Sequence, residues 1–227
     1  MSECNTITSF LRMLQNLIPY DDPNYEYCFR GQAVSNWEIS SSLSRKNLSS
    51  EEAKKRIYEE VIRNFPKEFS KVDELTFNDL AKMQHLAIPT DLIDVCFNPL
   101  VSLFFATEKG KGKKGVQSGI VYIFKIPKGA VEYTGNSRVF EAGRENKLRL
   151  LKTDFSNERI KRQNGAFIYI PQRDVTELRK YIIHSVTISN KSKKTIRKEL
   201  LRLGISHKTL FPELSEFYRE IENLIQK

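Results

Sequence analysis

The pattern of apolar and polar positions divides the first half of the chain into short helices and strands. Residues 7–18 place apolar side chains at helical spacing, which predicts an amphipathic helix. The aromatic-rich segment 25–29 predicts a strand that ends in a turn at Arg30 and Gly31. Ser49 and Ser50 precede a helical pattern that continues to about residue 65. A further short helix is predicted for residues 77–86.

Strands and helices continue to mix in the rest of the chain. Residues 92–96 are compatible with a strand, and Pro99 opens an apolar segment at 100–106 that predicts a buried helix. The further predicted elements are strands at 119–126, 166–170 and 181–188, a basic helix at 191–203 and an amphipathic helix at 212–225. Because the elements do not alternate strictly, we expect an α+β fold with a mixed or antiparallel β core surrounded by helices.

The composition narrows the class of protein. With 227 residues, 40% of them hydrophobic and 29% charged, the chain can bury a core, which excludes global disorder. Its cysteines, Cys4, Cys28 and Cys96, are odd in number and lack metal-ligand spacing, which argues against disulfides and a zinc site. We find no secretory signal and no apolar run that could span a membrane. We therefore expect a cytoplasmic protein with no bound metal and no membrane partner.

The formal net charge of +9 is unevenly distributed. Residues 1–108 carry 11 basic and 16 acidic side chains, a net charge of −5, whereas residues 109–227 carry 26 and 12, a net charge of +14. This asymmetry suggests a face that meets an anion, although a solvated basic surface explains it equally well. The Gly- and Lys-rich segment 109–115 predicts a flexible loop.

Three segments place polar residues in apolar surroundings. Arg30, followed by Gly31 and Gln32, is suited to grip a phosphate, or else to pair with an acidic residue and join two elements. His85 and Asp94 could form an acid/base pair, or belong with Thr90 to a capping and turn network. The third segment includes Arg159 and Gln163 and predicts a basic turn at which a phosphate could bind; a solvated loop is the alternative.

Taken together, these motifs resemble the FRG domain family. The matching residues are Phe29-Arg30-Gly31-Gln32, Trp37, Ser42-Leu43 with Arg45, Gln84-His85, Ile88-Pro89-Thr90, Leu92-Ile93-Asp94, Asn98-Pro99-Leu100, Phe104-Phe105-Ala106, Arg159, Gln163, Gly165 and Phe167. The resemblance implies an FRG domain over residues 25–227, with residues 1–24 as a leader helix packed on it. Asp91 and Cys96 depart from the family pattern, where Arg and Thr are common.

A more distant likeness, to ADP-ribosyltransferases of the arginine–serine–glutamate type, implies a split sheet and a ligand. By that analogy Arg30 would bind the phosphates of NAD, and the strand around Asp94 would line the nicotinamide pocket. Gln163 would lie near the position of the catalytic glutamate, which a neutral amide replaces only weakly. Glu158 is a nearby carboxylate that could substitute.

Two functions follow from these resemblances. One is an NAD-consuming enzyme, an ADP-ribosyltransferase or NAD glycohydrolase acting as a toxin or anti-phage effector, with NAD as substrate and no permanently bound cofactor. The other is a non-catalytic module that binds a nucleotide or a nucleic acid. A metal-dependent nuclease is a weaker third reading, and no P-loop or G-x-G-x-x-G fingerprint occurs. We predict that His85, Asp94 and Gln163 act in catalysis and that the ligand is bound by Arg30, Gly31, Gln32, Thr90 and Arg159. These residues should converge in space.

Overall fold

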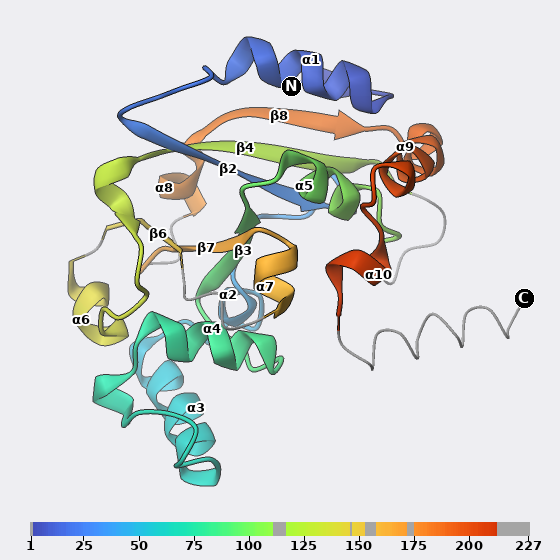
Figure 1. Cartoon of the computed structure of the whole chain (residues 1–227). Helices are drawn as coiled ribbons and strands as arrows, with labels where there is room; N and C mark the ends of the chain where they lie inside the picture. Colours follow the sequence, from blue (N-terminus) through green and yellow to red (C-terminus); the bar gives the residue numbers. More distant parts are fainter. Residues whose placement is uncertain (1, 111–116, 146, 153–157, 172–174, 213–227) are drawn as a thin grey trace, which may run out of the picture.

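The computed structural model describes the whole chain except residues 1, 111–116, 146, 153–157, 172–174 and 213–227. The described residues form an eight-stranded mixed sheet with helices packed against it, so the predicted α+β class is confirmed (Figure 1). The strands are β1 (Ser2–Cys4), β2 (Tyr25–Gln32), β3 (Leu92–Cys96), β4 (Gly119–Pro127), β5 (Val131–Glu132), β6 (Arg149–Leu151), β7 (Gly165–Tyr169) and β8 (Ile182–Ile188).

Most of the helices lie between strands along the chain, and the last two described helices follow β8. The α-helices are α1 (Ile7–Leu17), α2 (Ser42–Arg45), α3 (Glu51–Asn64), α4 (Phe77–His85), α5 (Pro99–Ala106), α6 (Val139–Arg144), α7 (Glu158–Arg162), α8 (Val175–Arg179), α9 (Asn190–Arg202) and α10 (His207–Leu210). The described residues also form two short 3-10 helices, η1 (Val72–Glu74) and η2 (Lys128–Ala130). None of the helices in the described part of the chain is long and apolar enough to cross a bilayer.

The sheet consists of two halves that meet between β2 and β3. The strand order is β1-β8-β4-β2-β3-β7-β6-β5, in which β1 pairs with β8 and β5 with β6 in parallel, and the other pairs are antiparallel. Strand β2 pairs with β4 along its whole length, and β3 pairs with β7 along its whole length. In contrast, β2 and β3 share a single register pair, Phe29 with Cys96. The backbones therefore separate on either side of this pair, and the sheet is split at its centre.

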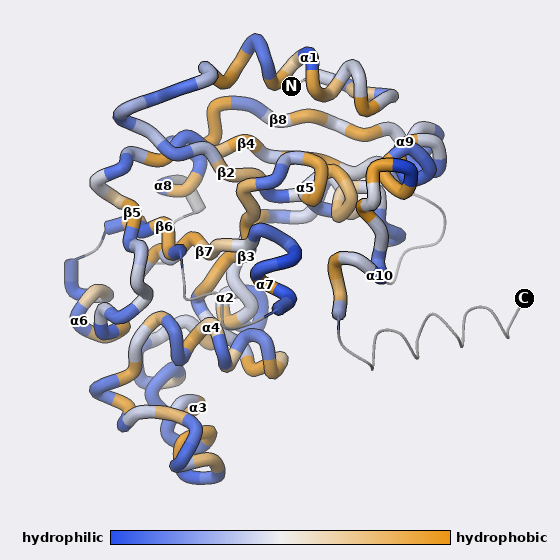
Figure 2. The backbone as a smooth tube through the Cα atoms, in the orientation of Figure 1, coloured by the Kyte–Doolittle hydropathy of each residue, from blue (hydrophilic) through white to orange (hydrophobic). Residues whose placement is uncertain are grey.

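Apolar side chains form three clusters around the two halves. One lies between the β1-β8-β4-β2 half and helices α1, α5, α9 and α10, and includes Phe10, Phe104 and Ile196. A second joins the β3-β7-β6 half to α3, α4 and α6, and includes Tyr58 and Phe77. The third lies on the opposite face and spans both halves. Figure 2 shows apolar strands at the centre of the view and a hydrophilic α7 next to β3.

The N-terminal segment belongs to the first half of the sheet. Thr6 caps α1, which buries Ile7, Phe10 and Leu14 in the cluster shared with α9. The backbone N–H of Ile7 donates to the Glu199 carboxylate of α9 at 3.0 Å. Helix α1 therefore packs on the sheet, and the preceding residues add β1, a strand that the sequence pattern did not predict.

Two basic residues of α9 hold the end of α5. The buried ammonium of Lys193 donates to the carbonyl oxygens of Ala33 and Glu108 at 2.6 and 3.0 Å. Arg197 donates to the Phe104 carbonyl and forms an ion pair with Glu108. Cations at the C-terminal end of a helix compensate its dipole and its free carbonyls. Part of the positive charge of the second half thus has a structural role.

Most predicted elements are confirmed within a few residues. Ser50 caps α3, and Asn98 caps α5 with Pro99 at its first turn, as the sequence indicated. The predicted turn at Arg30 and Gly31 is wrong, because both residues continue β2 and pair with Tyr122 and Val121 of β4. The helix predicted at 212–225 and most of the loop at 109–115 lie outside the described residues.

Candidate functional site

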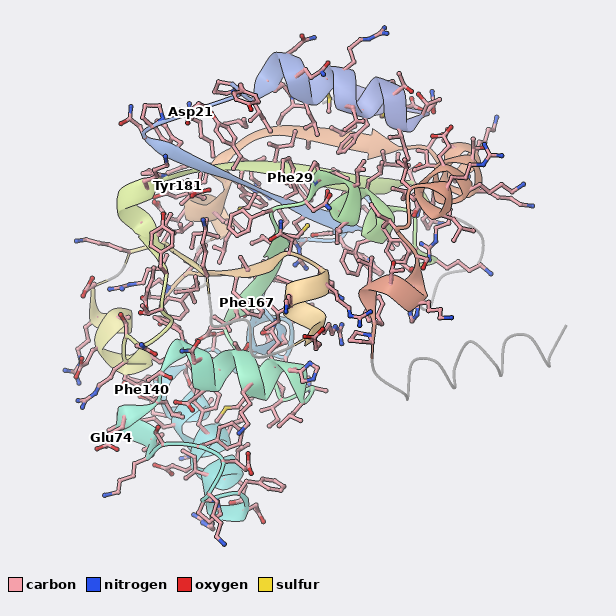
Figure 3. All side chains as sticks on the ribbon, in the orientation of Figure 1. Asp21, Phe29, Glu74, Phe140, Phe167 and Tyr181 are labelled. Carbon is pink, nitrogen blue, oxygen red and sulfur yellow. The ribbon has the colours of Figure 1, made fainter. Side chains whose placement is uncertain are left out.

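A pocket of about 310 Å³ lies over the seam between the two half-sheets. Strands β2, β3 and β7 form its floor, and α4, α5 and α7 form its walls. It is lined by Phe29, Arg30, Gly31, Ala81, Gln84, His85, Asp94, Val95, Cys96, Phe105, Arg159, Ile160, Gln163, Gly165, Ala166 and Phe167. Figure 3 labels Phe29 and Phe167, which reach this pocket from different half-sheets. The structure thus brings the three predicted segments together.

Arg30 lies at the centre of the site. Its Nη1 donates to the backbone oxygen of Asp94 at 2.6 Å, so the guanidinium group bridges β2 and β3 beside their single register pair. Burial lowers the pKa of Arg30, the Asp94 carboxylate opposes that shift, and the Arg45 guanidinium adds to it. An arginine stays protonated through such a shift. Within the described part of the chain, neither arginine has an ion-pair partner.

Two further pockets meet the first one at Arg30. One, of about 900 Å³, extends past Trp37 and Arg45 to Lys109. The other, of about 140 Å³, is lined by Arg30, Arg45 and Asp94 among others. Because Arg30 lines all three pockets, they adjoin one another and together form the cleft around this residue.

Gly31 is required by the packing of α5. A Cβ atom at this position would lie 1.8 Å from the Ser102 carbonyl oxygen and 2.9 Å from the Ala106 nitrogen. Gly31 was predicted to take part in ligand binding. Instead, a helix occupies the face where the side chain would be, although the residue also borders two of the pockets. The close approach of α5 thereby fixes β2 next to Arg30.

A side-chain network orders the β3 side of the pocket. The Gln84 amide nitrogen donates to the Asp94 carboxylate at 2.8 Å, and the fully buried Thr90 hydroxyl donates to the Gln84 amide oxygen. The same hydroxyl accepts a hydrogen bond from the backbone N–H of Leu92 at 3.2 Å. Thr90 therefore positions Gln84 and β3 and does not line the pocket. The network is of the capping and turn kind that the sequence analysis left open.

The proposed acid/base pair of His85 and Asp94 is not formed. Both side chains are exposed and border the pocket, but no hydrogen bond or ion pair joins them in the described structure. Successive residues of a helix point about 100° apart, and at the end of α4 it is Gln84 that faces Asp94. His85 remains available to a ligand in the pocket.

The third predicted segment closes the pocket from α7 and the turn after it. The Gln163 amide donates to the Leu210 carbonyl oxygen at 3.2 Å. The Arg159 guanidinium lies 4.7 Å from the centre of the Phe211 ring. Both residues line the pocket, as predicted. Glu158 is exposed, pairs with Lys161 and Arg162 on its own helix and is absent from the lining, so the suggested substitute carboxylate points elsewhere.

Gln32 connects Arg30 to the neighbouring pocket. It is 5% exposed, its amide oxygen accepts from Nε of Arg30 at 3.2 Å, and its amide nitrogen donates to the Trp37 carbonyl at 2.9 Å. The sequence analysis assigned it to ligand binding, and its contacts give it a positioning role as well. Trp37 and Arg45 were recognised as family motif residues but were not predicted to line the site. Because Trp37 and Arg45 follow Arg30 closely in the sequence, this short spacing could have indicated that they line the same site.

The two departures from the family pattern have structural explanations. Asp91 is buried and forms an ion pair with Lys54 of α3 at 2.6 Å. Burial raises the pKa of Asp91, and Lys54 opposes that shift. Burial also raises the pKa of Cys96 to about 12. Its thiol is therefore protonated at neutral pH and unsuited to act as a nucleophile. In the described residues, no group of three His, Cys, Asp or Glu side chains is placed to hold a metal ion.

Comparison with known protein families matches residues 25–115 to the FRG domain. The matched segment contains Arg30, Gln84, His85 and Asp94, whereas Gln163 lies beyond it, although the resemblance noted in the sequence extends to the C-terminal helix. No curated protein and no solved structure matches the chain. The FRG resemblance is therefore confirmed for residues 25–115, and the likeness to ADP-ribosyltransferases stays a prediction.

Proposed function

We propose that this chain, whose residues 25–115 carry an FRG domain, binds a phosphate-bearing nucleotide of the NAD type in the cleft around Arg30. One observation carries the proposal: two neighbouring arginines, Arg30 and Arg45, have no ion-pair partner in the described structure and line the same two pockets. Guanidinium groups bind phosphates through paired N–H donors. A nucleotide phosphate would neutralise two like charges that now repel each other.

The charges around the cleft favour a diphosphate over a single carboxylate. Arg159 lines the pocket over the seam together with Arg30, and Asp94 is the acidic residue of that pocket. The adjoining pocket carries Arg45 and Lys109 as well as Glu38 and Glu108. A diphosphate group carries about two negative charges, and each charged hydrogen bond that it makes is worth about 1.5–3 kcal/mol. Asp94 is itself bonded to Gln84 and is exposed, so it is available to a ribose hydroxyl next to the phosphates.

The enzymatic form of the proposal assigns the catalytic carboxylate to Asp94. Cleavage of the bond between nicotinamide and ribose develops positive charge on the sugar, and a carboxylate stabilises that charge. Gln163 is neutral, and Glu158 lies outside the lining of the pocket. Asp94 supplies the negative charge from the floor, and Gln84 orients it. In this form the protein is an NAD glycohydrolase or an ADP-ribosyltransferase, as expected of a toxin or an anti-phage effector.

Calorimetric titration with NAD, ADP-ribose and nicotinamide riboside tests the binding proposal. We expect the two diphosphates to bind and the phosphate-free riboside to bind at least about tenfold more weakly, which corresponds to about 1.4 kcal/mol. Arg30→Gln should lower the affinity for NAD by more than about tenfold, because it removes a charged hydrogen-bond donor. Arg12→Gln, an exposed arginine of α1, is the matched control.

Nicotinamide release, followed by chromatography, tests the enzymatic form separately. We expect Asp94→Asn to retain NAD binding and to lose release. If Arg30→Gln melts at the temperature of the parent and binds NAD equally well, the binding proposal is wrong. Binding without any release, with or without protein acceptors, would leave a binding module and exclude the NAD-cleaving enzyme.

A second candidate function, nucleic-acid binding, is favoured by the outer face of α9. Its charged residues with structural partners, Lys193, Arg197 and Glu199, point inward. Its outer face carries four exposed cations, which make no ion pair with the described part of the chain: Lys191, Lys194, Lys198 and Arg202. Such a stripe fits the phosphates of a polynucleotide.

Salt dependence distinguishes this candidate from the nucleotide proposal. If four phosphates are contacted, the affinity for a labelled single-stranded oligonucleotide should fall with a log–log slope of about −3. Replacing all four cations with glutamine should abolish that slope and leave NAD binding unchanged. An oligonucleotide affinity that is insensitive to salt would exclude this role for α9.

A further inference from the structure

The pocket beyond Arg30 has the features of an aromatic binding site. It has a volume of about 900 Å³, within the range typical of ligand sites, and it is lined by Trp37 and Phe105. Trp37 is the single tryptophan of the chain, and 39% of its surface is exposed. Exposing an indole ring to water is unfavourable, and rings left open in a pocket commonly stack on a planar ligand.

The Trp37 loop is held in place by hydrogen bonds. The backbone N–H of Trp37 donates to the Val34 carbonyl oxygen at 3.2 Å, and the backbone N–H of Ser35 donates to the Ser118 carbonyl oxygen at 2.8 Å. The buried Gln32 amide joins the Trp37 carbonyl on one side to the Arg30 guanidinium on the other. Trp37 and Arg30 are therefore fixed relative to each other without a ligand, which lowers the entropy cost of binding.

The remaining lining of this pocket matches a base and its sugar. Arg45 and Lys109 place positive charge on its walls, which also carry the carboxylates of Glu38 and of Glu108, the latter paired with Arg197. Asn47 offers an amide that can both donate and accept hydrogen bonds. Arg30 and Gly31 also line the pocket over the seam, so the two pockets adjoin at these residues. A ligand with two ring systems joined by a diphosphate spans such an arrangement.

From this arrangement we infer that the ligand is a dinucleotide and that its adenine base stacks on Trp37, while its diphosphate lies between Arg30 and Arg45. The inference rests on the proposed function, because it uses the same phosphate site. The inference assigns the nicotinamide end to the pocket over the seam, which is lined by Asp94 and His85. Trp37 then determines which nucleotides bind tightly, because a mononucleotide without adenine leaves its pocket empty.

The single tryptophan makes this inference directly measurable. Intrinsic fluorescence of the full chain should be quenched by NAD, ADP-ribose and ADP, and it should stay unchanged with nicotinamide mononucleotide, whose binding is followed by calorimetry. Trp37→Leu should weaken NAD binding about tenfold, because stacking a base on an aromatic ring is worth about 1–3 kcal/mol. The same variant should bind nicotinamide mononucleotide as the parent does.

Tyr20→Leu is the matched control, because Tyr20 is a fully exposed aromatic residue that lines none of these pockets. NAD binding that is equally tight in Trp37→Leu, in a protein whose fold is retained by circular dichroism, would overturn the inference while the proposed function stands. Quenching by nicotinamide mononucleotide would overturn the assignment of adenine to this pocket. No binding of any of these nucleotides to the parent protein would overturn the proposed function itself, and this inference with it.

Discussion

Replacing Gly31 with alanine tests the packing that positions the site. The new Cβ atom would lie 1.8 Å from the Ser102 carbonyl oxygen, whereas ordinary contacts begin near 3.4 Å. The obstacle is the backbone of α5, which buries Val101, Leu103 and Phe104 and cannot swing away as a side chain would. Helix and strand must therefore separate by about 1.6 Å, the difference between these two distances.

The size of the effect follows from overpacking. Forcing extra atoms into a filled core costs typically about 1–3 kcal/mol, and a backbone obstacle places Gly31→Ala near the upper value. With a denaturant dependence of about 3 kcal/mol per M of urea, the unfolding midpoint should fall by about 1 M. Far-UV circular dichroism during urea titration measures this shift.

Gly129→Ala is the control, because a Cβ atom at that position meets nothing within 4 Å. Its unfolding free energy should change by less than about 0.5 kcal/mol. If Gly31→Ala is as stable as this control, α5 does not pack on β2 as closely as described. The position of Arg30 beside the seam would then lose its structural basis.

Three further variants or measurements test the buried polar groups. Lys193→Met leaves two backbone carbonyls without their donor and should lower the unfolding free energy by about 1–3 kcal/mol in urea titration, whereas Lys194→Met, on the exposed face, should not. Asp91→Asn leaves the buried charge of Lys54 without its partner and should lower the unfolding free energy by about 3–5 kcal/mol. Replacing both partners with apolar residues should restore much of this stability. A double variant that is equally unstable would contradict the pairing. Because burial raises the pKa of Cys96 to about 12, its thiolate fraction at about pH 8 is roughly one in ten thousand. A disulfide reagent should therefore label Cys96 only after unfolding. Rapid labelling of Cys96 in the native protein would contradict its burial.

The elements that sequence reasoning located are those with chemical markers at their ends. Ser50 and Asn98 cap helices α3 and α5, and Pro99 fixes the first turn of α5, so these helices begin where predicted. Strand β1, in contrast, has three residues with no apolar alternation, and it exists because β8 offers it an edge. Pairing of this kind depends on residues far away in the chain and leaves no local pattern.

For the candidate site, too, some features were predictable from the sequence and others were not. The order of the motifs correctly predicted that Arg30, Asp94 and Gln163 would converge. The sequence could not show whether Gln84 or His85 donates a hydrogen bond to Asp94. The answer depends on how α4 is rotated about its axis over β3. The role of Gly31 was not predictable either. A glycine in a strand indicates that another group approaches the backbone closely, but the sequence does not identify that group, which here is the backbone of α5.

The pairing of β1 with β8 has a consequence for how the protein is made. Ser2 pairs with Val186, and the N–H of Ile7 donates to Glu199, so residues 2–7 must wait, after their own synthesis, for partners in β8 and α9. At about 5–20 residues per second, that delay is roughly 10–40 s. Throughout it, the apolar face of α1, with Phe10 and Leu14, lacks the side chains of β8 and α9 that share its cluster. Nascent chains of this protein should therefore depend on chaperones that shield this face until β8 and α9 have been synthesised.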